Sequence, residues 1–453
     1  MSTGVSVVEE INATSPIPPP VVGAGVIQQS DLILIHGFLV FFMQTGFVSL
    51  ELGYGRSKNV RNILLKNFVD LLLCALCWWL VGYGLENGKS AGGFIGSSSF
   101  AGESEGNWNK SYFFTFSFAL CTISIVGGCL AERTHLLAYP IFTVVTSSWV
   151  YPVFAFWVWN QQSWLQNLGT CQFLDFAGGA VVHATGGCMG LVGAILCGPR
   201  MGRFEDGVAK SMPGHDASSV AMGTLFLWFG WLGFNCGSLY LQPNGPTLVN
   251  TGYIVDRIAL NMTLSAAGSG LTALTISSIQ SGTFDLVVLC NGILSGLVSA
   301  TATCGYVAPW AALVIGVISG SAYICCSRML LRLQIDDPLD STAIHLCGGL
   351  VGTLLNSMFA EPYYLTLLLS SQCGGFIYTS TGGSQLGMQL LGVVLCLSWS
   401  TAFSLLVFLP LKYFGFLRVD QATELAGIDN IEHGGPAYPE FNLVNYSVHG
   451  PQS

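Results

Sequence analysis

The most constraining feature of this sequence is a series of long apolar stretches, each close to the roughly 20 residues that an α-helix needs to cross a bilayer. Eleven such stretches occur in 453 residues. Only 9% of the residues are charged, whereas about 25% are charged in a soluble domain. The sequence therefore predicts an all-α polytopic membrane protein. The expected spans are residues 32–54, 65–85, 112–131, 136–158, 176–198, 218–240, 253–276, 283–301, 306–330, 340–360 and 386–412.

Basic residues are distributed unequally between the two sides that eleven spans define. Twelve of the fifteen Lys and Arg residues fall on one side, and only Lys89, Lys110 and Arg257 fall on the other. Because positive charge marks the cytoplasmic loops, we expect an extracellular N-terminus and a cytoplasmic C-terminus. The acidic groups behind the net charge of −9 are scattered, and no basic run indicates nucleic-acid binding.

The composition divides the chain into three parts. Residues 1–30 are rich in Pro and lack the apolar core of a signal peptide, so we expect a disordered extracellular tail. Residues 31–413 form the eleven-helix transmembrane domain, and residues 414–453 form a cytoplasmic tail. Two glycosylation sequons, at Asn12 and Asn109, lie on the expected outer side.

Most of the cysteines lie within spans, where a free thiol behaves as a small apolar group. Cys74 and Cys77 have CxxC spacing but no second pair of ligands, so we expect no metal site. Cys171 and Cys373 fall in outer loops, and the sequence leaves open whether they form a disulfide.

Two stretches share one spacing: an Asp, seven residues, a His, two residues and a Gly-Gly pair. They run over 175–187 and 337–349. The first opens the fifth span and the second opens the tenth, so they enter the membrane from opposite faces. This pattern predicts two inverted five-helix repeats followed by an additional eleventh helix. The paired glycines are expected to allow close contact between helices.

His183 and His345 are the strongest candidates for a functional role. Each lies eight residues after its Asp, about 12 Å along a helix, and therefore near the middle of a hydrocarbon core about 30 Å thick. An ionisable side chain at that depth is a functional candidate by default. The alternative is that each imidazole satisfies a polar group in a packed interior, but the matching registers favour function. Two neutral imidazoles can share one hydrogen bond.

Other residues have two explanations each. Asp175 and Asp337 both fit caps at the starts of their helices, and Asp340 is also expected to cap the tenth helix. Asp175 equally fits an acid that draws a cation toward the membrane. The aromatic residues around Trp159 and from Trp228 to Phe234 fit an interfacial belt. They equally fit a cation site built from ring faces, with Ser238 offering a hydroxyl.

Several motifs together resemble a known family. They are Asp175–His183, Gly127–Arg133, Trp228–Ser238, Asp336–His345 and the tail segment from Ala426 to Tyr438. These stretches are similar to the signatures of the ammonium transporter family, which includes the Mep permeases and the Rhesus glycoproteins. The similarity extends over about residues 30–440 in the expected order, and Gly198–Phe204 resembles the plant-type branch.

The resemblance implies a plasma-membrane homotrimer whose subunits each contain a pore for ammonium or ammonia, with methylammonium as a related substrate. It implies no enzyme activity, cofactor or metal. The recruitment site would comprise Phe118, Trp159 and Ser238, with Asp175 nearby. Phe118 and Phe234 would form the gate, and His183 and His345 would be the twin histidines of the pore.

The sequence departs from the family pattern at two places. His345 lies between Ile344 and Leu346, where many relatives have Gly, so its packing is expected to differ. Ile431 occupies the position of a phosphorylatable Thr in plant-type members, so that switch is expected to be absent. The tail is still expected to have a regulatory role, through a cytoplasmic partner or across subunits. A sensor that binds ammonium with little flux, and a Rhesus-type neutral gas channel, are the competing functions.

Overall fold

Eleven helices of the computed structural model are long and apolar enough to cross a membrane, and each coincides with a predicted span. The structure describes residues 29–102, 111–245 and 251–438. The predicted N-terminal tail and both sequons therefore lie outside the described residues or at their margin. The fold prediction is confirmed: the described residues form a helical bundle, with only two short antiparallel hairpins.

The first half of the bundle contains five spans. Its elements are α1 (Gln29–Tyr54), η1 (Ser57–Asn59), α2 (Val60–Cys77), η2 (Trp78–Gly82), α3 (Tyr83–Asn87), β1 (Ser90–Ala91), β2 (Ile95–Gly96), η3 (Phe100–Gly102), α4 (Tyr112–Leu130), α5 (Ala138–Val145), η4 (Thr146–Val150), α6 (Tyr151–Trp159), η5 (Gly179–Ala184) and α7 (Thr185–Cys197).

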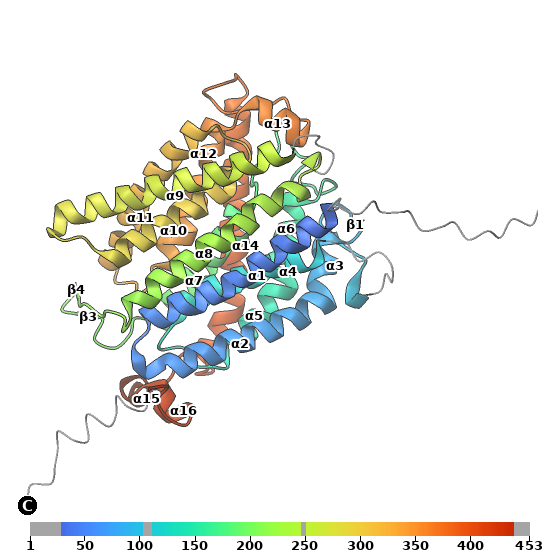
Figure 1. The fold of residues 1–453 in the computed structure, drawn as a ribbon. Helices are drawn as coiled ribbons and strands as arrows, with labels where there is room; N and C mark the ends of the chain where they lie inside the picture. Colours follow the sequence, from blue (N-terminus) through green and yellow to red (C-terminus); the bar gives the residue numbers. More distant parts are fainter. Residues whose placement is uncertain (1–28, 103–110, 246–250, 439–453) are drawn as a thin grey trace, which may run out of the picture.

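The second half contains the remaining six spans and the tail helices. Its elements are β3 (Phe204–Glu205), β4 (Val208–Ala209), α8 (Ala217–Ser238), η6 (Leu239–Leu241), α9 (Thr251–Ser281), α10 (Leu286–Thr303), α11 (Pro309–Arg332), η8 (Thr342–Cys347), α12 (Gly348–Phe359), α13 (Pro362–Leu369), α14 (Gly382–Tyr413), α15 (Gln421–Ala426) and α16 (Ile428–Glu432). Figure 1 shows α15 and α16 together at one end of the bundle and α13 at the opposite end.

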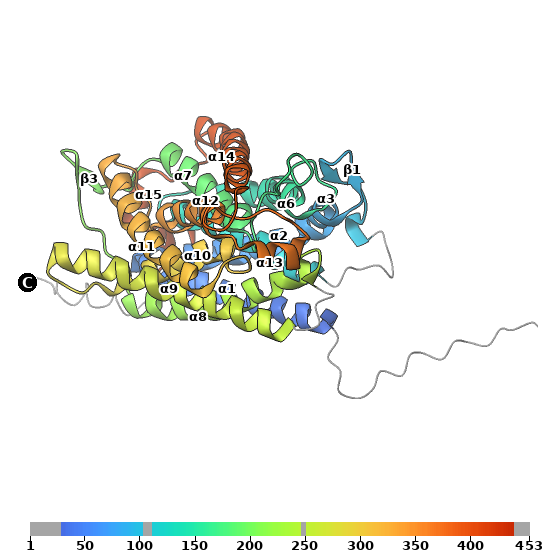
Figure 2. The ribbon, with the colours of Figure 1, turned by 90° about the horizontal axis from the view of Figure 1, so that it is seen from above.

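The two halves meet through their matching segments. The π-helical turn η5 packs on α12, while the π-helical turn η8 packs on α7. This reciprocal packing is what an inverted repeat produces, because each repeated segment contacts the other running in the opposite direction. The last span, α14, lies at the edge of the bundle when the molecule is seen from above (Figure 2). We refer below to the two ends of the bundle as the Asp175 end and the Asp337 end.

Glycines allow the close helix contacts that the sequence predicts. A Cβ on Gly187 would lie 2.5 Å from the backbone nitrogen of Leu346, and one on Gly349 would lie 2.3 Å from the carbonyl oxygen of Gly179. Neither site has room for a side chain. The crossing of the two repeats therefore depends on Gly187 and Gly349, one glycine of each pair.

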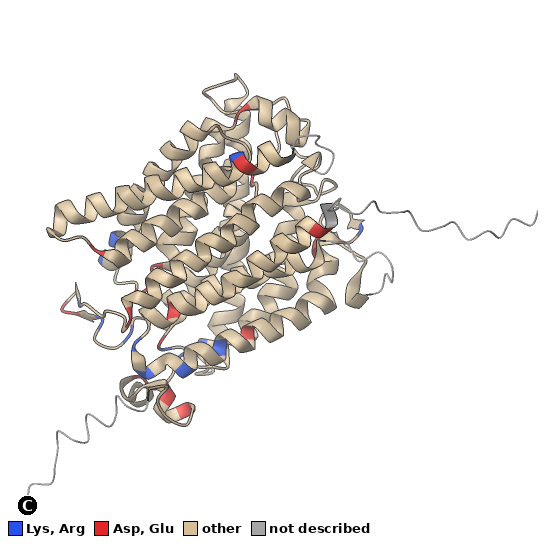
Figure 3. Ribbon diagram, in the orientation of Figure 1, with Lys and Arg blue, Asp and Glu red and all other residues tan. Residues whose placement is uncertain are grey.

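The charged residues are sparse along the bundle, and the basic ones gather mainly at the end that holds the C-terminal helices (Figure 3). There, Glu132 receives hydrogen bonds from Arg56 at 2.8 Å and from Arg200. Arg200 also donates to Asp336 at 2.8 Å. Burial disfavours the charged form of Glu132, but the guanidinium groups of Arg200 and Arg56 outweigh it and lower its pKa to about 2.

Candidate functional site

The two predicted histidines meet inside the bundle. The Nδ1 atoms of His183 and His345 are 3.2 Å apart, and the rings are nearly parallel with centroids 5.3 Å apart. Both side chains are buried, with 0% and 4% of their surface exposed. The Nε2 atom of His183 has no hydrogen-bond partner among the described residues. A shared hydrogen bond between the Nδ1 atoms leaves each Nε2 available to a passing molecule.

Each histidine lies in a π-helical turn that opens its helix, His183 in η5 and His345 in η8. Single π-turns inside α-helices are rare and occur frequently at functional sites. The extra residue per turn rotates the side chain relative to the rest of the helix. The sequence predicted the two helices but contains no signal from which these turns could have been read.

An aspartate carboxylate caps the start of each of these two helices. The carboxylate of Asp175 accepts hydrogen bonds of 2.6 to 3.0 Å from four backbone N–H groups, those of residues 178 to 181. Asp337 accepts one from the N–H of Thr342 at 2.6 Å. The carboxylates therefore occupy equivalent places in the two repeats and satisfy N–H groups that a helix start leaves unpaired.

The prediction that Asp340 caps the tenth helix is wrong. Its carboxylate accepts hydrogen bonds from the hydroxyl of Tyr323 at 3.1 Å and from that of Ser327 at 3.0 Å, both on α11. The residue has a positive φ of 55°, which turns the backbone and directs the side chain away from the helix start. Asp340 therefore joins the tenth span to α11 through hydrogen bonds, and Asp337 caps the start of the tenth helix.

Aromatic rings continue from the histidines toward the Asp175 end. The rings of Phe118 and Phe234 are stacked with centroids 3.7 Å apart. Phe234 lies 5.6 Å from the ring of His183, and Trp159 meets the edge of Phe118 at 6.1 Å. The stacked pair therefore lies between Trp159 and the histidines. Trp231 also stacks on His183 at 5.3 Å, and sequence reasoning assigned it no part in the pore.

Trp159 and Ser238 are held by backbone hydrogen bonds beside this stack. The indole Nε1 of Trp159 donates to the carbonyl of Asp175 at 2.9 Å, and the hydroxyl of Ser238 donates to the carbonyl of Phe234 at 2.9 Å. The second of these leaves the lone pairs of the Ser238 oxygen as acceptors. Asp175 is buried, and its carboxylate accepts hydrogen bonds from the start of its own helix. Its influence on a ligand would therefore be electrostatic.

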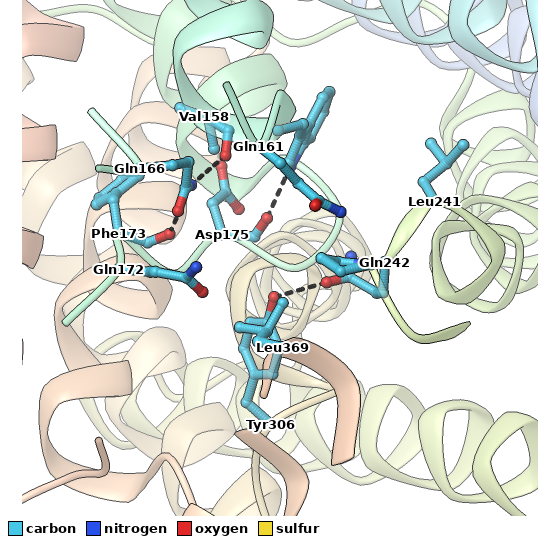
Figure 4. A pocket seen from close by; sticks show the side chains of 12 residues that line it. Val158, Gln161, Gln166, Gln172, Phe173, Asp175, Leu241, Gln242, Tyr306 and Leu369 are labelled. Atoms are coloured by element: carbon cyan, nitrogen blue, oxygen red, sulfur yellow. Dashed lines mark hydrogen bonds between the residues drawn. The ribbon is translucent and has the colours of Figure 1, made fainter. Parts of the chain in front are cut away.

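A pocket at the Asp175 end is lined in part by residues that the sequence did not single out, among them Gln242 and Tyr306 (Figure 4). The amide of Gln242 accepts a hydrogen bond from the hydroxyl of Tyr306 at 3.0 Å, and it donates to the carbonyl of Phe176 at 3.1 Å. Trp159 and Asp175 also line this pocket. Trp159 therefore lines the same pocket as the polar side chains at the Asp175 end.

A second, smaller cavity lies on the other side of the histidine pair. Its wall includes His345, Phe47, Glu51 and the hydroxyl residues Ser124 and Ser341. None of these except His345 was expected from the sequence, since they come from α1, α4 and the turn before η8. A line of side chains therefore runs from Trp159 through the phenylalanine pair and the histidines to a mostly apolar cavity, whose wall includes Glu51 and the hydroxyls of Ser124 and Ser341.

Comparison with known proteins identifies the family of the chain. The model of the Ammonium Transporter Family matches residues 32–438. The chain belongs to the ammonium transporter family. Its members are transporters, not enzymes. Ammonium transporter 3 of Dictyostelium discoideum is 40% identical over 404 residues, which cover 88% of this chain and 91% of that protein. Ammonium transporter Amt2 of Archaeoglobus fulgidus is 36% identical and covers 90% of this chain and 87% of its own.

Solved structures of ammonium transporters share the fold. The structure described as Sensor Amt Protein has a TM-score of 0.80 at 35% identity, covering 89% of this chain and 98% of its own. The Mep2 structure from Saccharomyces cerevisiae has a TM-score of 0.75 at 30% identity, covering 86% and 90%.

The structure of this ammonium transporter also defines a disulfide between two loops and the position of the C-terminal tail. Cys171 and Cys373, whose pairing the sequence left open, form a disulfide that joins the loop before η5 to the loop before α14. The tail helices α15 and α16 pack beside the start of α2, where Asp429 accepts hydrogen bonds from the N–H groups of Arg61 and Asn62 at 2.8 and 2.9 Å. The described part of the tail is therefore docked on the bundle.

Proposed function

We propose that this chain is a plasma-membrane ammonium transporter, with the Asp175 end outside the cell and the Asp337 end in the cytoplasm. The unequal distribution of basic residues supports this orientation, because the end with most of the Lys and Arg residues is the one expected in the cytoplasm. As in the family, we infer a homotrimer with one pore in each subunit.

The recruitment site is the edge formed by Trp159, Phe118 and Ser238. Ammonium is a small cation with four N–H donors. Aromatic faces attract such a cation, and a hydroxyl oxygen accepts one of its hydrogen bonds. The pocket beside Trp159 supplies further acceptors on the approach. Asp175 adds negative potential without forming a contact of its own.

The phenylalanine pair is the gate. Stacked rings with centroids 3.7 Å apart leave no space for a hydrated ion, so an ammonium ion that passes must lose its water. Because an isolated charge is costly in an apolar path, we infer that ammonium gives up its proton here to water on the Asp175 side, which becomes hydronium. Neutral ammonia then moves past His183 and His345, whose Nε2 atoms offer hydrogen bonds.

The single observation that carries this proposal is the line of rings that ends in the buried histidine pair. Uptake of labelled methylammonium into vesicles, together with the accompanying current, tests it. His183→Ala and His345→Ala should each reduce uptake, whereas Trp159→Ala and Ser238→Ala should raise the concentration needed for half-maximal uptake. Unchanged uptake and current in both histidine variants would refute the twin-histidine mechanism.

A second candidate function is a sensor that binds ammonium with little flux. It is favoured by the similarity in fold to the structure described as Sensor Amt Protein. Calorimetric binding of methylammonium to the purified protein, without uptake into vesicles, would favour the sensor. A Rhesus-type neutral gas channel fits less well, since Trp159 and Ser238 suit a cation. Such a channel would show uptake of ammonia with no saturation.

A further inference from the structure

Three ionisable side chains are buried on two neighbouring spans: an ion pair of Glu51 with Lys66, and Asp70 one helical turn after Lys66. Glu51 lies on α1, and Lys66 and Asp70 lie on α2, each at most 3% exposed. The ammonium group of Lys66 is 2.8 Å from a carboxylate oxygen of Glu51. Ionisable groups within membrane spans are costly and mark a function by default. The proposed function gives none of these three a role, although Glu51 lines the cavity beside His345.

The charges of this triad do not balance. It contains two carboxyl groups and one ammonium group, so it carries one excess negative charge unless it also holds a proton. One carboxylate oxygen of Asp70 accepts a hydrogen bond from Thr143 at 2.6 Å, and the other has no hydrogen-bond partner among the described residues. A carboxyl proton on that oxygen removes the excess charge.

Among the described residues, no other charge near Asp70 supplies the missing compensation. The charges that act on Asp70 are those of Lys66 and Glu51, and Lys66 lies one helical turn before Asp70 on the same face of α2. The remaining titratable neighbours are Tyr139, whose ring centroid is 5.5 Å from the Lys66 nitrogen, and the thiol of Cys74. A phenol and a thiol add no positive charge. The triad is therefore neutral only when it holds a proton.

The triad is connected to the transport path through Glu51. This side chain lines the same cavity as His345, together with the hydroxyls of Ser124 and Ser341. Gly127 leaves room for the ammonium group of Lys66, because a Cβ on Gly127 would lie 2.3 Å from the Lys66 nitrogen. A molecule that leaves His345 toward the Asp337 end therefore meets the carboxyl group of Glu51.

We propose that Glu51, Lys66 and Asp70 form a proton-holding triad that protonates ammonia after it passes His345. This inference rests on the proposed transport function. The lone pair of ammonia takes a proton from the Glu51 carboxyl group, which receives it from the Lys66 ammonium group, so that an N–H bond forms and a Glu51 O–H bond breaks. The neutral Lys66 amine is then protonated by the Asp70 carboxyl group, whose O–H bond breaks. The triad, now one charge more negative, recovers a proton from a hydronium ion on the same side of the membrane. The net change is ammonia plus hydronium to ammonium plus water.

A purely structural ion pair between α1 and α2 is the alternative role, and two variants separate the roles. Replacing a buried ion pair by apolar or neutral groups of similar volume is often neutral for stability. The double variant Glu51→Gln/Lys66→Met should therefore fold, and it should transport normally if the pair is only structural. Asp70→Asn leaves the ion pair intact and removes only the proton-holding carboxyl group.

The test is labelled methylammonium uptake into proteoliposomes in which the Asp337 end faces the lumen, measured over a range of lumenal pH. We expect Glu51→Gln, Asp70→Asn and the double variant to reduce uptake by about 100-fold, the lower part of the range for a positioned proton-transfer group. Their uptake should also lose its dependence on lumenal pH, and Glu51→Asp should retain most of both. Gly127→Ala, which displaces the Lys66 nitrogen, should behave like these variants.

Gly383→Ala is the matched control, because a Cβ there meets nothing within 4 Å. Thermal unfolding in detergent checks that each variant is folded. Wild-type uptake rates and pH dependence in Asp70→Asn and in the double variant would overturn the triad and leave the transport function intact. If the wild-type protein itself moves no methylammonium, the proposed function fails, and the triad fails with it.

Discussion

His183 and His345 come from opposite repeats and share a hydrogen bond between their Nδ1 atoms, which are 3.2 Å apart. Each imidazole fixes the tautomer of the other, because one Nδ1 donates and the other accepts. The pair is therefore one unit with two distinct ends. The Nε2 of the donor is an acceptor, and the Nε2 of the acceptor carries a proton.

The shared hydrogen bond predicts that the effects of His183→Ala and His345→Ala on stability are not additive. His183→Ala and His345→Ala each leave one buried Nδ1 without its partner, at a cost of about 1–3 kcal/mol in stability. The double variant removes both, so it should cost less than the sum of the two single changes. A double-mutant cycle of thermal unfolding in detergent measures the difference. Strict additivity would contradict the hydrogen bond.

The buried ionic cluster at the Asp337 end predicts sensitivity to acid. The pKa of Glu132 is about 2 in the folded protein, against an ordinary value of 4.5. The folded state therefore binds fewer protons, so this group's contribution to stability is full above pH 4.5 and is lost as the pH falls through about 2. Unfolding measured across this range should show the loss, and it should be smaller in Glu132→Gln.

Glu132→Gln should itself be destabilising near neutral pH. Removing one partner leaves the guanidinium group of Arg200 buried with less compensation, a change that typically costs about 3–5 kcal/mol. The shift in unfolding midpoint relative to the wild type measures the effect. Glu205→Gln is a matched control, because its ion pair with Lys210 is exposed and long at 3.4 Å, and it should change stability by less than about 1 kcal/mol.

The docked tail depends on Asp429. Its carboxylate caps the start of α2 by accepting hydrogen bonds from Arg61 and Asn62, and loss of such a cap costs about 0.5–2 kcal/mol. Asp429→Ala should therefore release α16 and increase cleavage of the tail by a protease. Asp429→Asn keeps an acceptor oxygen and should be cleaved more slowly than the Ala variant. Equal cleavage of wild type and Asp429→Ala would show that the cap does not hold the tail.

The disulfide predicts a dependence of stability on redox conditions. Cys171 and Cys373 are separated by 202 residues, and a cross-link of this kind typically contributes about 2–5 kcal/mol. Cys373→Ser should lower the unfolding midpoint and should make it insensitive to a reductant. The wild-type midpoint should fall toward that of the variant when a reductant is added. A wild-type midpoint that does not respond would argue that the bond is absent or contributes nothing.

The parts of the site that sequence patterns could predict were those with a periodic or repeated signal. His183 and His345 stand at the same distance from an Asp and a Gly-Gly pair, so both their importance and their convergence could be inferred. Phe47, Glu51 and Gln242 have no such signal. Glu51 is an ionisable residue within the first predicted span, which marks a candidate, but only the packing of the helices places Glu51 and Phe47 beside His345 and places Gln242 beside Trp159.

The sequence by itself determined that this chain is an eleven-span membrane protein with an inverted repeat, because bilayer thickness fixes helix length and the paired motif fixes the register of the halves. Only the tertiary structure decided that Asp337 and not Asp340 caps the tenth helix, that Cys171 bonds to Cys373, and that Glu51 reaches the cavity at His345. These facts depend on local backbone turns and on which helices pack together. Such contacts join residues far apart in the chain, and spacing along a sequence does not encode them.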